Sequence, residues 1–187
     1  MKKRSLFILL TAWILLLAGC STAQPAKSES ATELGVTPLF GTFSATTLEG
    51  ETVSEELFSG HKLTMVNIWA TFCSPCINEM PSLGELDGEY GEEFQVVGII
   101  VDAADQNGNP LSRQKADAEE IVSFTKADYL HLLPSPDLNR AYLHGVQSVP
   151  ETVFLDENGC QVGQRYIGAR SKAEWKAIID SLLEELA

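Results

Sequence analysis

The stretch from Met65 to Leu83, MVNIWATFCSPCINEMPSL, decides the fold of this chain. It opens with an apolar run that contains β-branched residues, which predicts a buried strand. A short connection leads from this run into the C-x-x-C motif of Cys73 and Cys76. A segment that can form a helix follows. We expect Pro81 to kink or end this helix, because proline lacks the N–H that the helix needs.

A strand that runs into a helix at this motif places the first sulfur at the helix N-terminus. There the unpaired N–H groups and the helix dipole favour an anion, and a thiolate is an anion. We therefore predict that Cys73 is the exposed nucleophile with a lowered pKa, and that Cys76 is the shielded resolving thiol. Pro75 suits the first turn, where a missing N–H costs nothing. These residues predict a dithiol that closes reversibly to a disulfide.

The residues around the motif extend this pattern. They are the W-A-x-x-C-x-x-C run from Trp69 to Cys76, Glu79, Pro81, Asn67 within the strand, and the distant pair Val149 and Pro150. Together they resemble the thioredoxin superfamily and, within it, the TlpA/ResA-like group of extracytoplasmic thiol–disulfide oxidoreductases. The resemblance covers roughly residues 38 to 187. It implies a thiol–disulfide oxidoreductase whose only redox group is the cysteine pair, with no further cofactor.

The resemblance also implies how the resolving thiol loses its proton. Glu79 lies three positions beyond Cys76, on the same helix face, and matches the acidic residue of the group. It would be the base for Cys76, and the alternative is a solvated helix glutamate. Asn67 does not titrate, so it would support the site from behind as a polar strand residue. Trp69 and Pro75 would support the site as well.

The second landmark is the pair Val149 and Pro150. In the superfamily a cis-proline loop faces the C-x-x-C motif and offers backbone hydrogen bonds to the substrate, and the alternative here is a trans proline at the start of a strand. Glu151 stands where many relatives have Thr. If its carboxylate points at Cys73, it would oppose thiolate formation, and Glu151→Thr would lower the Cys73 pKa. Phe72 replaces the Trp that is usual before the first cysteine.

The order of the predicted elements is that of a thioredoxin fold, an α/β domain with a central mixed sheet flanked by helices. A hairpin that turns at Glu49 and Gly50 would form an N-terminal extension. The polar loop 102–117, followed by a helical segment 118–127, would form a central insertion. The other predicted strands are 63–70, 94–101, 130–133, 153–155 and 161–167, and the other predicted helices are 74–90, 137–144 and 171–186.

The chain begins with a leader. A basic start at Lys2, Lys3 and Arg4 precedes an apolar run of 12 residues, too short to cross a bilayer but suited to a signal peptide. The run ends in L-A-G-C, which resembles the lipoprotein cleavage box and implies lipidation of Cys20. An ordinary secretory signal is the alternative. Residues 1–19 would be the signal peptide, 20–37 a flexible tether and 38–187 the thioredoxin-like domain.

Charge and histidine spacing exclude other classes of function. The formal charge is -13, and loss of the three basic leader residues would make it -16, which argues against nucleic acid as a partner. His61, His131 and His144 are scattered, and the spacing is C-x-x-C rather than the C-x-x-x-C of copper-carrying relatives. We therefore expect no metal site. A peroxidatic site is disfavoured as well, because Ala70 stands where such a site needs Thr.

One cysteine is left over after the lipid site and the redox pair are assigned. Cys160 follows a Glu-Asn-Gly hairpin-turn signal at 157–159. We interpret it as a small, half-buried strand residue, and the alternative is a second redox role.

The sequence as a whole predicts a monomeric, lipid-anchored thioredoxin-like reductase in the bacterial cell envelope, on the extracytoplasmic side. The resemblance implies that its electrons come from a membrane thiol transporter of the CcdA/DsbD type. They would pass to a disulfide-containing partner, either apocytochrome c or a methionine sulfoxide reductase. Two alternatives stay open. One is an oxidase that uses the same residues in the opposite direction, and the other is a lipoprotein binding module with a structural C-x-x-C disulfide.

Overall fold

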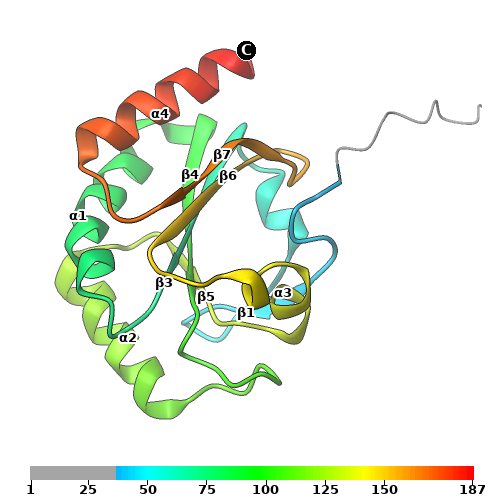
Figure 1. Ribbon diagram of the computed structural model, residues 1–187, viewed down its shortest axis with the longest axis vertical. Helices are drawn as coiled ribbons and strands as arrows, with labels where there is room; N and C mark the ends of the chain where they lie inside the picture. Colours follow the sequence, from blue (N-terminus) through cyan, green and yellow to red (C-terminus); the bar gives the residue numbers. More distant parts are fainter. Residues whose placement is uncertain (1–36) are drawn as a thin grey trace, which may run out of the picture. The chain divides into compact units, whose positions relative to one another are not determined.

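The structure, a computed structural model, describes residues 37–187. The leader, the Cys20 lipidation site and the tether up to residue 36 lie outside the described residues. Five strands form one mixed sheet in the order β5-β4-β3-β6-β7 (Figure 1). Strands β3, β4 and β5 run parallel, whereas β6 is antiparallel to both β3 and β7. Their bounds are β3 Leu63–Trp69, β4 Phe94–Ile100, β5 Leu130–Leu132, β6 Glu151–Asp156 and β7 Gln161–Ile167.

Two layers cover this sheet. Helices α1 (Ser74–Glu89), α2 (Ser112–Thr125) and α4 (Lys172–Glu185) lie on one face, called here the helix face (Figure 1). Helix α3 (Pro136–Ala141) and the aromatic N-terminal segment of Phe40, Phe43 and Phe58 pack on the other, the hairpin face. This arrangement confirms the predicted thioredoxin fold.

Strand β3 explains how the two faces are built, because all seven of its residues are buried. Successive strand side chains point to opposite faces, so every second residue belongs to the same layer. Leu63, Met65, Asn67 and Trp69 point to the helix face, and Val66 and Ile68 point to the hairpin face. The strand therefore delivers Asn67 to the layer that contains α1 and its two cysteines.

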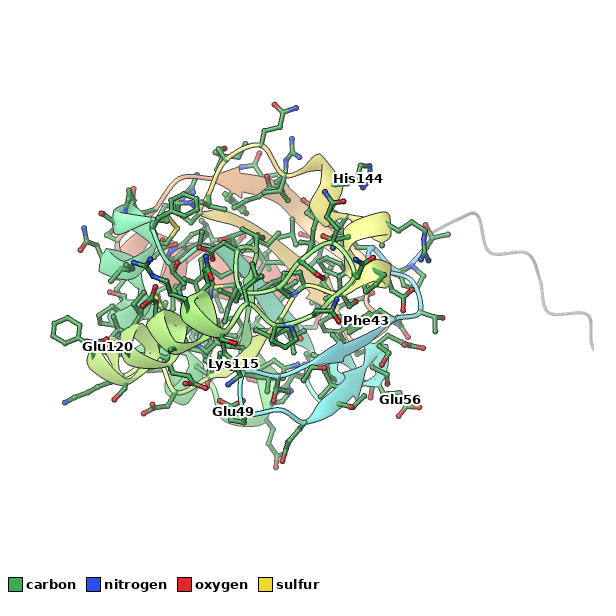
Figure 2. All side chains as sticks on the ribbon, turned by 90° about the horizontal axis from the view of Figure 1, so that it is seen from below. Phe43, Glu49, Glu56, Lys115, Glu120 and His144 are labelled. Carbon is green, nitrogen blue, oxygen red and sulfur yellow. A yellow bond between two sulfur atoms is a disulfide. The ribbon has the colours of Figure 1, made fainter. Side chains whose placement is uncertain are left out.

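The predicted N-terminal hairpin is present. Strands β1 (Ser44–Thr46) and β2 (Thr52–Ser54) pair antiparallel, and a 3-10 turn, η1 (Glu55–Phe58), follows. The hairpin is fixed to the edge of the main sheet, since Leu48 N–H donates to the His131 carbonyl at 2.8 Å and Leu133 N–H donates to the Thr46 carbonyl at 2.8 Å. It thereby covers the edge of β5, which would otherwise be open. Figure 2 shows Glu49 and Glu56 in this region.

The predicted helix 74–90 is present as α1 with Pro81 inside it, whereas the start of α2 differs from prediction. Pro81 does not end α1, which continues to Glu89. The side chains on both sides of the proline, Met80 and Leu83, are fully buried, and this packing holds the helix together. Helix α2 begins at Ser112, six residues before the predicted start, so the insertion loop is shorter than 102–117. Its first turn contains Arg, Gln and Lys, which are good helix formers as well as polar residues.

The remaining strands and α4 lie close to the predicted positions, but the predicted helix 137–144 ends early, since α3 stops at Ala141 and a 3-10 turn follows. Helix α4 begins with the predicted capping box, in which Ser171 and Glu174 each bond the other's backbone N–H. Two further 3-10 turns are η2 (Gly91–Glu93) and η3 (Leu143–Gly145). Within residues 37–187, none of the helices is both long enough and apolar enough to cross a bilayer.

Candidate active site

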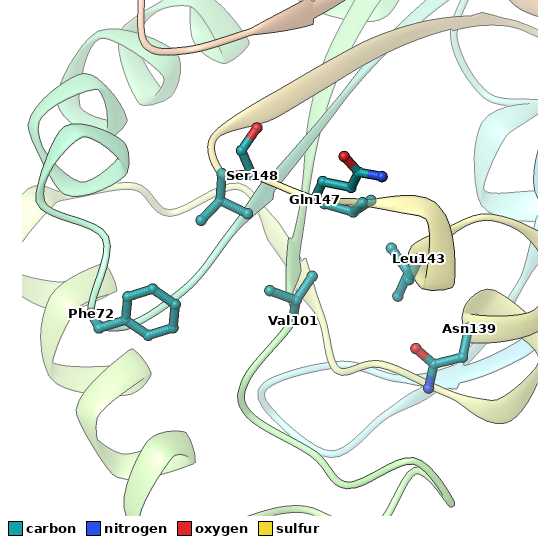
Figure 3. Close-up of a pocket in the computed structure, with 8 residues that line it drawn as sticks. Phe72, Val101, Asn139, Leu143, Gln147 and Ser148 are labelled. Atoms are coloured by element: carbon teal, nitrogen blue, oxygen red, sulfur yellow. The ribbon is translucent and has the colours of Figure 1, made fainter.

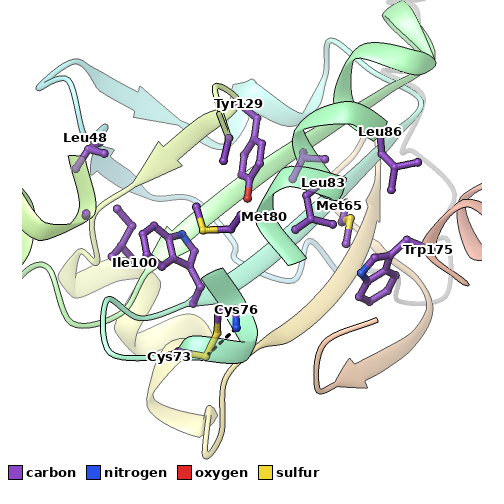
Figure 4. Packing of buried hydrophobic residues seen from close by; sticks show 14 of the residues in the cluster. Leu48, Met65, Cys73, Cys76, Met80, Leu83, Leu86, Ile100, Tyr129 and Trp175 are labelled. Atoms are coloured by element: carbon purple, nitrogen blue, oxygen red, sulfur yellow. Dashed lines mark hydrogen bonds between the residues drawn. A yellow bond between two sulfur atoms is a disulfide. The ribbon is translucent and has the colours of Figure 1, made fainter. Parts of the chain in front are cut away.

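The C-x-x-C motif lies where β3 passes into α1. Cys73 is the N-cap of the helix, and its Sγ accepts the Cys76 backbone N–H at 3.3 Å (Figure 4). The two sulfurs form a disulfide with an S–S distance of 2.04 Å. Cys76 is fully buried, as predicted for the resolving position, but Cys73 is only 5% exposed. The prediction of an exposed Cys73 is therefore wrong for this disulfide form.

A pocket beside the motif is lined by the loop that precedes β6. The Val149–Pro150 peptide bond is cis, as predicted. Val149 and Phe72 line the same pocket of 260 Å³, together with Val101 (Figure 3). The cis-proline loop and the C-x-x-C loop thus form two walls of one depression. Phe72 is 76% exposed at its rim, so it presents an apolar ring next to the disulfide.

Glu79 lies one turn beyond Cys76, in the interior. It is only 3% exposed, which is inconsistent with a solvated helix glutamate. Its Oε1 accepts Asn67 Nδ2–H at 3.1 Å, and its Oε2 accepts the Arg170 backbone N–H at 3.1 Å and Trp175 Nε1–H at 3.2 Å. Burial raises the pKa of Glu79, and these hydrogen bonds together with the Arg170 charge oppose the rise. The carboxyl group is thus buried yet supplied with donors for its charged form.

Arg170 lines the pocket that lies between Glu79 and solvent. Its guanidinium lies 4.9 Å from the ring centre of Tyr166 and 5.0 Å from that of Trp175, a geometry that favours cation–π attraction. A pocket of 340 Å³ opens beside it, and Glu79 and Pro75 are among the lining residues. Water in this pocket can exchange a proton with Glu79, because Glu79 lies at its wall.

Three polar partners of the site were missed by sequence reasoning. Thr152 Oγ1 accepts the second bond of Asn67 Nδ2 at 3.1 Å. The Asp102 carboxylate accepts the Thr71 backbone N–H at 3.0 Å and its hydroxyl at 2.6 Å, which fixes the loop before Cys73. A signal for Asp102 was available, since it follows a buried parallel strand at the carboxyl edge, where sites gather in α/β sheets.

The third missed partner is His131, which the sequence reading treated as an isolated histidine. It is fully buried, its Nδ1 accepts Trp69 Nε1–H at 3.2 Å, and its Nε2 lies 2.9 Å from the Ala127 carbonyl. Because Nδ1 accepts, Nε2 carries the proton and the ring is neutral. Burial lowers the pKa of His131 to about 4. A Cβ on Gly98 would lie 2.2 Å from Nδ1, so this glycine makes room for the ring.

No group of three His, Cys, Asp or Glu residues is placed to hold a metal within the part of the chain that the structure describes.

Glu151 does not point at Cys73. Its Oε1 accepts the Tyr142 hydroxyl at 2.6 Å and lies 3.8 Å from the Arg165 guanidinium. Neighbouring strand residues alternate, so Thr152 faces the helix side with Asn67 and Glu151 faces the hairpin side. Burial and the bond to Glu151 raise the pKa of Tyr142 to about 12. The premise that Glu151 opposes the Cys73 thiolate is therefore wrong.

Cys160 differs from the prediction in its burial and in its place. It is 6% exposed rather than half-buried, and it precedes β7 instead of lying in it. Burial, with a smaller effect of the Asp156 charge, raises the pKa of its thiol. A buried thiol that resists ionisation is a poor nucleophile, which argues against a second redox role.

Known proteins are similar to this chain in sequence and in fold. The sequence profile of the Redoxin family matches residues 30–180. The thioredoxin-like protein YneN of Bacillus subtilis is 31% identical over 138 residues, which are 74% of this chain and 75% of that protein. The thiol-disulfide oxidoreductase ResA of Halalkalibacterium halodurans is 30% identical over 112 residues, which are 60% of this chain and 57% of that protein.

A solved structure adds the same likeness in three dimensions. The thiol:disulfide interchange protein of the thioredoxin family from Chlorobium tepidum TLS superposes with a TM-score of 0.65 at 26% sequence identity. The superposition covers 81% of this chain and 99% of that one.

Proposed function

Because this chain belongs to the Redoxin family and is a thioredoxin-like thiol–disulfide oxidoreductase, we propose that it reduces disulfides of partner proteins through Cys73 and Cys76. One observation supports the proposal most. The bonded sulfurs lie at the N-terminus of α1, beside the cis-Pro150 loop, and the buried carboxyl of Glu79 is one turn away. A helix N-terminus stabilises the Cys73 thiolate, and a buried acid can take the proton of the thiol that must attack second.

The exchange has two steps. The Cys73 thiolate attacks one sulfur of a partner disulfide, so that a mixed disulfide forms and the other partner sulfur leaves with the electron pair and takes up a proton. Cys76 then gives its proton to Glu79 and attacks Cys73. The Cys73–Cys76 bond forms, the mixed disulfide breaks, and the second partner sulfur leaves and is protonated. Two electrons and two protons pass to the partner, and the chain ends in the disulfide form observed here.

Glu79 suits the second step because it is a buried carboxyl group one turn from Cys76 whose pKa is raised. A thiol as buried as Cys76 loses its proton only to a nearby base. Burial raises the pKa of Glu79, whereas its N–H donors keep the charged form accessible. A base with a raised pKa takes a thiol proton more readily than an ordinary carboxylate does.

The source of electrons and the place of action follow from the resemblance to the TlpA/ResA-like group. Electrons would come from a membrane thiol transporter of the CcdA/DsbD type and pass to apocytochrome c or to a methionine sulfoxide reductase. Lipidation of Cys20, supported by the L-A-G-C run after the basic leader, would anchor the chain on the extracytoplasmic side of a membrane. Residues 20–37 would tether the monomeric domain of residues 38–187. The cysteine pair would be its only redox group.

Trapping of the mixed disulfide tests the reaction. The Cys76→Ser variant cannot complete the second step, so incubation with a disulfide-bonded partner should accumulate a covalent complex through Cys73. Cys160→Ser is the matched control and should release reduced partner as the unmodified chain does. Absence of a trapped complex with Cys76→Ser, under conditions in which the unmodified chain reduces the partner, would contradict the role of Cys73 as nucleophile.

A redox titration separates the three functions. Equilibration of Cys73 and Cys76 with glutathione should give a potential in the range of reducing thioredoxins, about -270 mV. A structural disulfide would lie below about -300 mV and resist exchange, and an oxidase would lie near about -120 mV. Either of these results would replace the reductase by the corresponding alternative.

A further inference from the structure

The two polar atoms of the Asn67 side-chain amide differ, since the nitrogen has hydrogen-bond partners and the oxygen has none. Its Nδ2 donates to Glu79 Oε1 and to Thr152 Oγ1, both at 3.1 Å. Its Oδ1 is also buried, and it has no hydrogen-bond partner. A buried carbonyl oxygen without a partner is costly, so this oxygen calls for an explanation. The nitrogen and oxygen of an amide have nearly the same size, so half a turn of the group exchanges donor and acceptor without a change in packing.

The two oxygens of Glu79 differ in the same respect. Oε2 accepts the Arg170 backbone N–H and Trp175 Nε1–H. Both groups are donors only, so a proton on Oε2 would meet two hydrogens that cannot be turned away. Oε1 accepts only the Asn67 amide. A proton received from Cys76 therefore resides on Oε1, where Asn67 faces it.

We infer that Asn67 is a positioning residue that turns over with the proton of Glu79. When Glu79 is ionised, Asn67 Nδ2 donates to Oε1, as observed. When Glu79 is neutral, the amide is reversed, and Oδ1 accepts the Glu79 hydroxyl and the Thr152 hydroxyl, which rotates to donate. In the second arrangement Oδ1 has two partners, and Nδ2 takes the buried position where Oδ1 had none, so each arrangement leaves one end of the amide bonded and the other end without a partner. This inference rests on the proposed role of Glu79 as the base for Cys76.

The other groups around Glu79 do not reverse in this way. The Arg170 guanidinium keeps its positive charge and favours the ionised carboxylate. Tyr129, which is buried, feels the charge of Glu79, and its pKa is raised by burial and by that charge, so its hydroxyl stays neutral. Cys76 exchanges its proton with Glu79 and is the reacting group itself. Among the groups that donate a hydrogen bond to the Glu79 carboxylate, only the Asn67 amide can offer a donor to the anion and an acceptor to the acid.

The orientation of the amide can be followed directly by NMR. The reduced full chain would be labelled with ¹⁵N at asparagine and with ¹³C at the glutamate carboxyl, and titrated with acid. Above the midpoint of Glu79, the side-chain amide protons of Asn67 should show NOEs to the Thr152 methyl group. Below that midpoint these NOEs should weaken sharply, because the nitrogen has moved away from Thr152. Persistence of the same NOEs while the Glu79 carboxyl titrates would overturn the inference.

The Thr152→Val variant gives an independent test. It removes one hydrogen bond from each arrangement, because the Thr152 hydroxyl accepts Asn67 Nδ2–H in the ionised form and donates to Oδ1 in the neutral form, so the Glu79 midpoint should change by less than about half a pH unit. Thr64→Val is the matched control, because Thr64 is an equally buried strand threonine whose hydroxyl accepts Gln95 Nε2–H instead. A clearly raised midpoint in Thr152→Val, as expected if the amide stays fixed and only the ionised form loses a bond, would count against the reversal.

The failure of this inference and the failure of the proposed function can be told apart. In the Glu79→Gln variant the NOEs of Asn67 should become independent of pH, and the release of partner from the mixed disulfide should slow. If release is as fast as in the unmodified chain, Glu79 is not the base, and the inference falls with the proposed function. If release slows while the Asn67 NOEs of the unmodified chain do not follow Glu79, the base role stands and the reversal is wrong.

Discussion

Two buried titratable groups lie on the helix face of the sheet, and each accepts the indole N–H of a tryptophan. Glu79 accepts Trp175 Nε1–H, and His131 accepts Trp69 Nε1–H. Burial drives both toward their neutral forms, which raises the pKa of the acid and lowers the pKa of the histidine to about 4. The same physical force therefore acts on two side chains of opposite chemistry.

The difference lies in what surrounds them. Glu79 accepts three N–H groups, lies one turn from Cys76 and borders a pocket open to solvent, so it can hold a charge and exchange a proton. His131 has one donor and one acceptor, both satisfied by its neutral ring, and Gly98 leaves no spare room beside it. Burial alone does not make a group reactive. A buried group becomes reactive when hydrogen-bond donors also stabilise its charged form and a route to solvent is open to its proton.

The largest expected effect is on the rate at which the mixed disulfide is released. Glu79→Gln removes the base, so release of the mixed disulfide at neutral pH should slow by about 100-fold or more. Acid quenching, alkylation and mass measurement of the trapped species follow this step. Glu85→Gln, an exposed glutamate on the same helix, should release the partner at the unmodified rate. Equal release rates for Glu79→Gln and Glu85→Gln would mean that Glu79, like His131, takes no part in proton transfer.

The pH dependence of the free energy of unfolding has opposite signs for His131 and Glu79. His131 has a folded pKa of about 4, below its ordinary 6.5, so the unfolded chain binds a proton first as the pH falls. Its contribution is fully present above pH 6.5, and about 3 kcal/mol is lost on the way down to pH 4. The raised pKa of Glu79 acts in the opposite sense, because its stabilising effect is lost as the pH rises.

Denaturant titrations at a series of pH values measure these contributions. The His131→Asn variant should be less stable at neutral pH, where it lacks the packing of the ring, and its stability should fall less between pH 6.5 and 4 than that of the unmodified chain. An identical slope in the two proteins would show that His131 does not stay neutral in the fold.

The tight space around His131 predicts a cost for a single methyl group. In Gly98→Ala the new Cβ would overlap Nδ1 and crowd Trp69 Nε1, so the free energy of unfolding should fall by about 1–3 kcal/mol. Gly88→Ala is the control, because a Cβ there has open space and a helical alanine is favourable. Chemical denaturation compares the two. A neutral Gly98→Ala would mean that the histidine can move aside.

A second buried carboxylate, that of Glu151, gives the smallest expected effect. Glu151 bonds Tyr142 on the hairpin face, away from the cysteines, so Glu151→Gln should leave the thiolate titration of Cys73 unchanged. The far-ultraviolet absorbance of the thiolate in the reduced chain measures this titration. A lowered Cys73 pKa in the variant would restore the earlier expectation that this carboxylate opposes the thiolate.

Features set by local chemistry could be predicted from the sequence. The strand before the motif, the disulfide pair, the capping box at Ser171 and the cis-Pro150 loop each follow from a short run of residues or from a family pattern. The extent of α1 also agrees with prediction, although a proline lies inside it, because buried neighbours on both sides of Pro81 stabilise the helix there.

The polar partners behind the site were the hardest to foresee. Asn67 bonds a threonine 85 residues away, and Trp69 bonds a histidine 62 residues away. Such pairs depend on which strands become neighbours and in which register, and one sequence carries no local signal of either. The sequence therefore predicted the Cys73–Cys76 pair well and the hydrogen bonds around it poorly.

One measurement tests directly whether Cys73 is the nucleophile and Cys76 the shielded resolving thiol. The reduced chain would be exposed briefly to iodoacetamide at neutral pH, and the modified peptides would be mapped by mass. The helix N-terminus should ionise Cys73, so the label should appear there first, while the buried Cys76 stays unmodified. Equal labelling of both cysteines, or earlier labelling of Cys76, would contradict the assignment of Cys73 as the attacking sulfur.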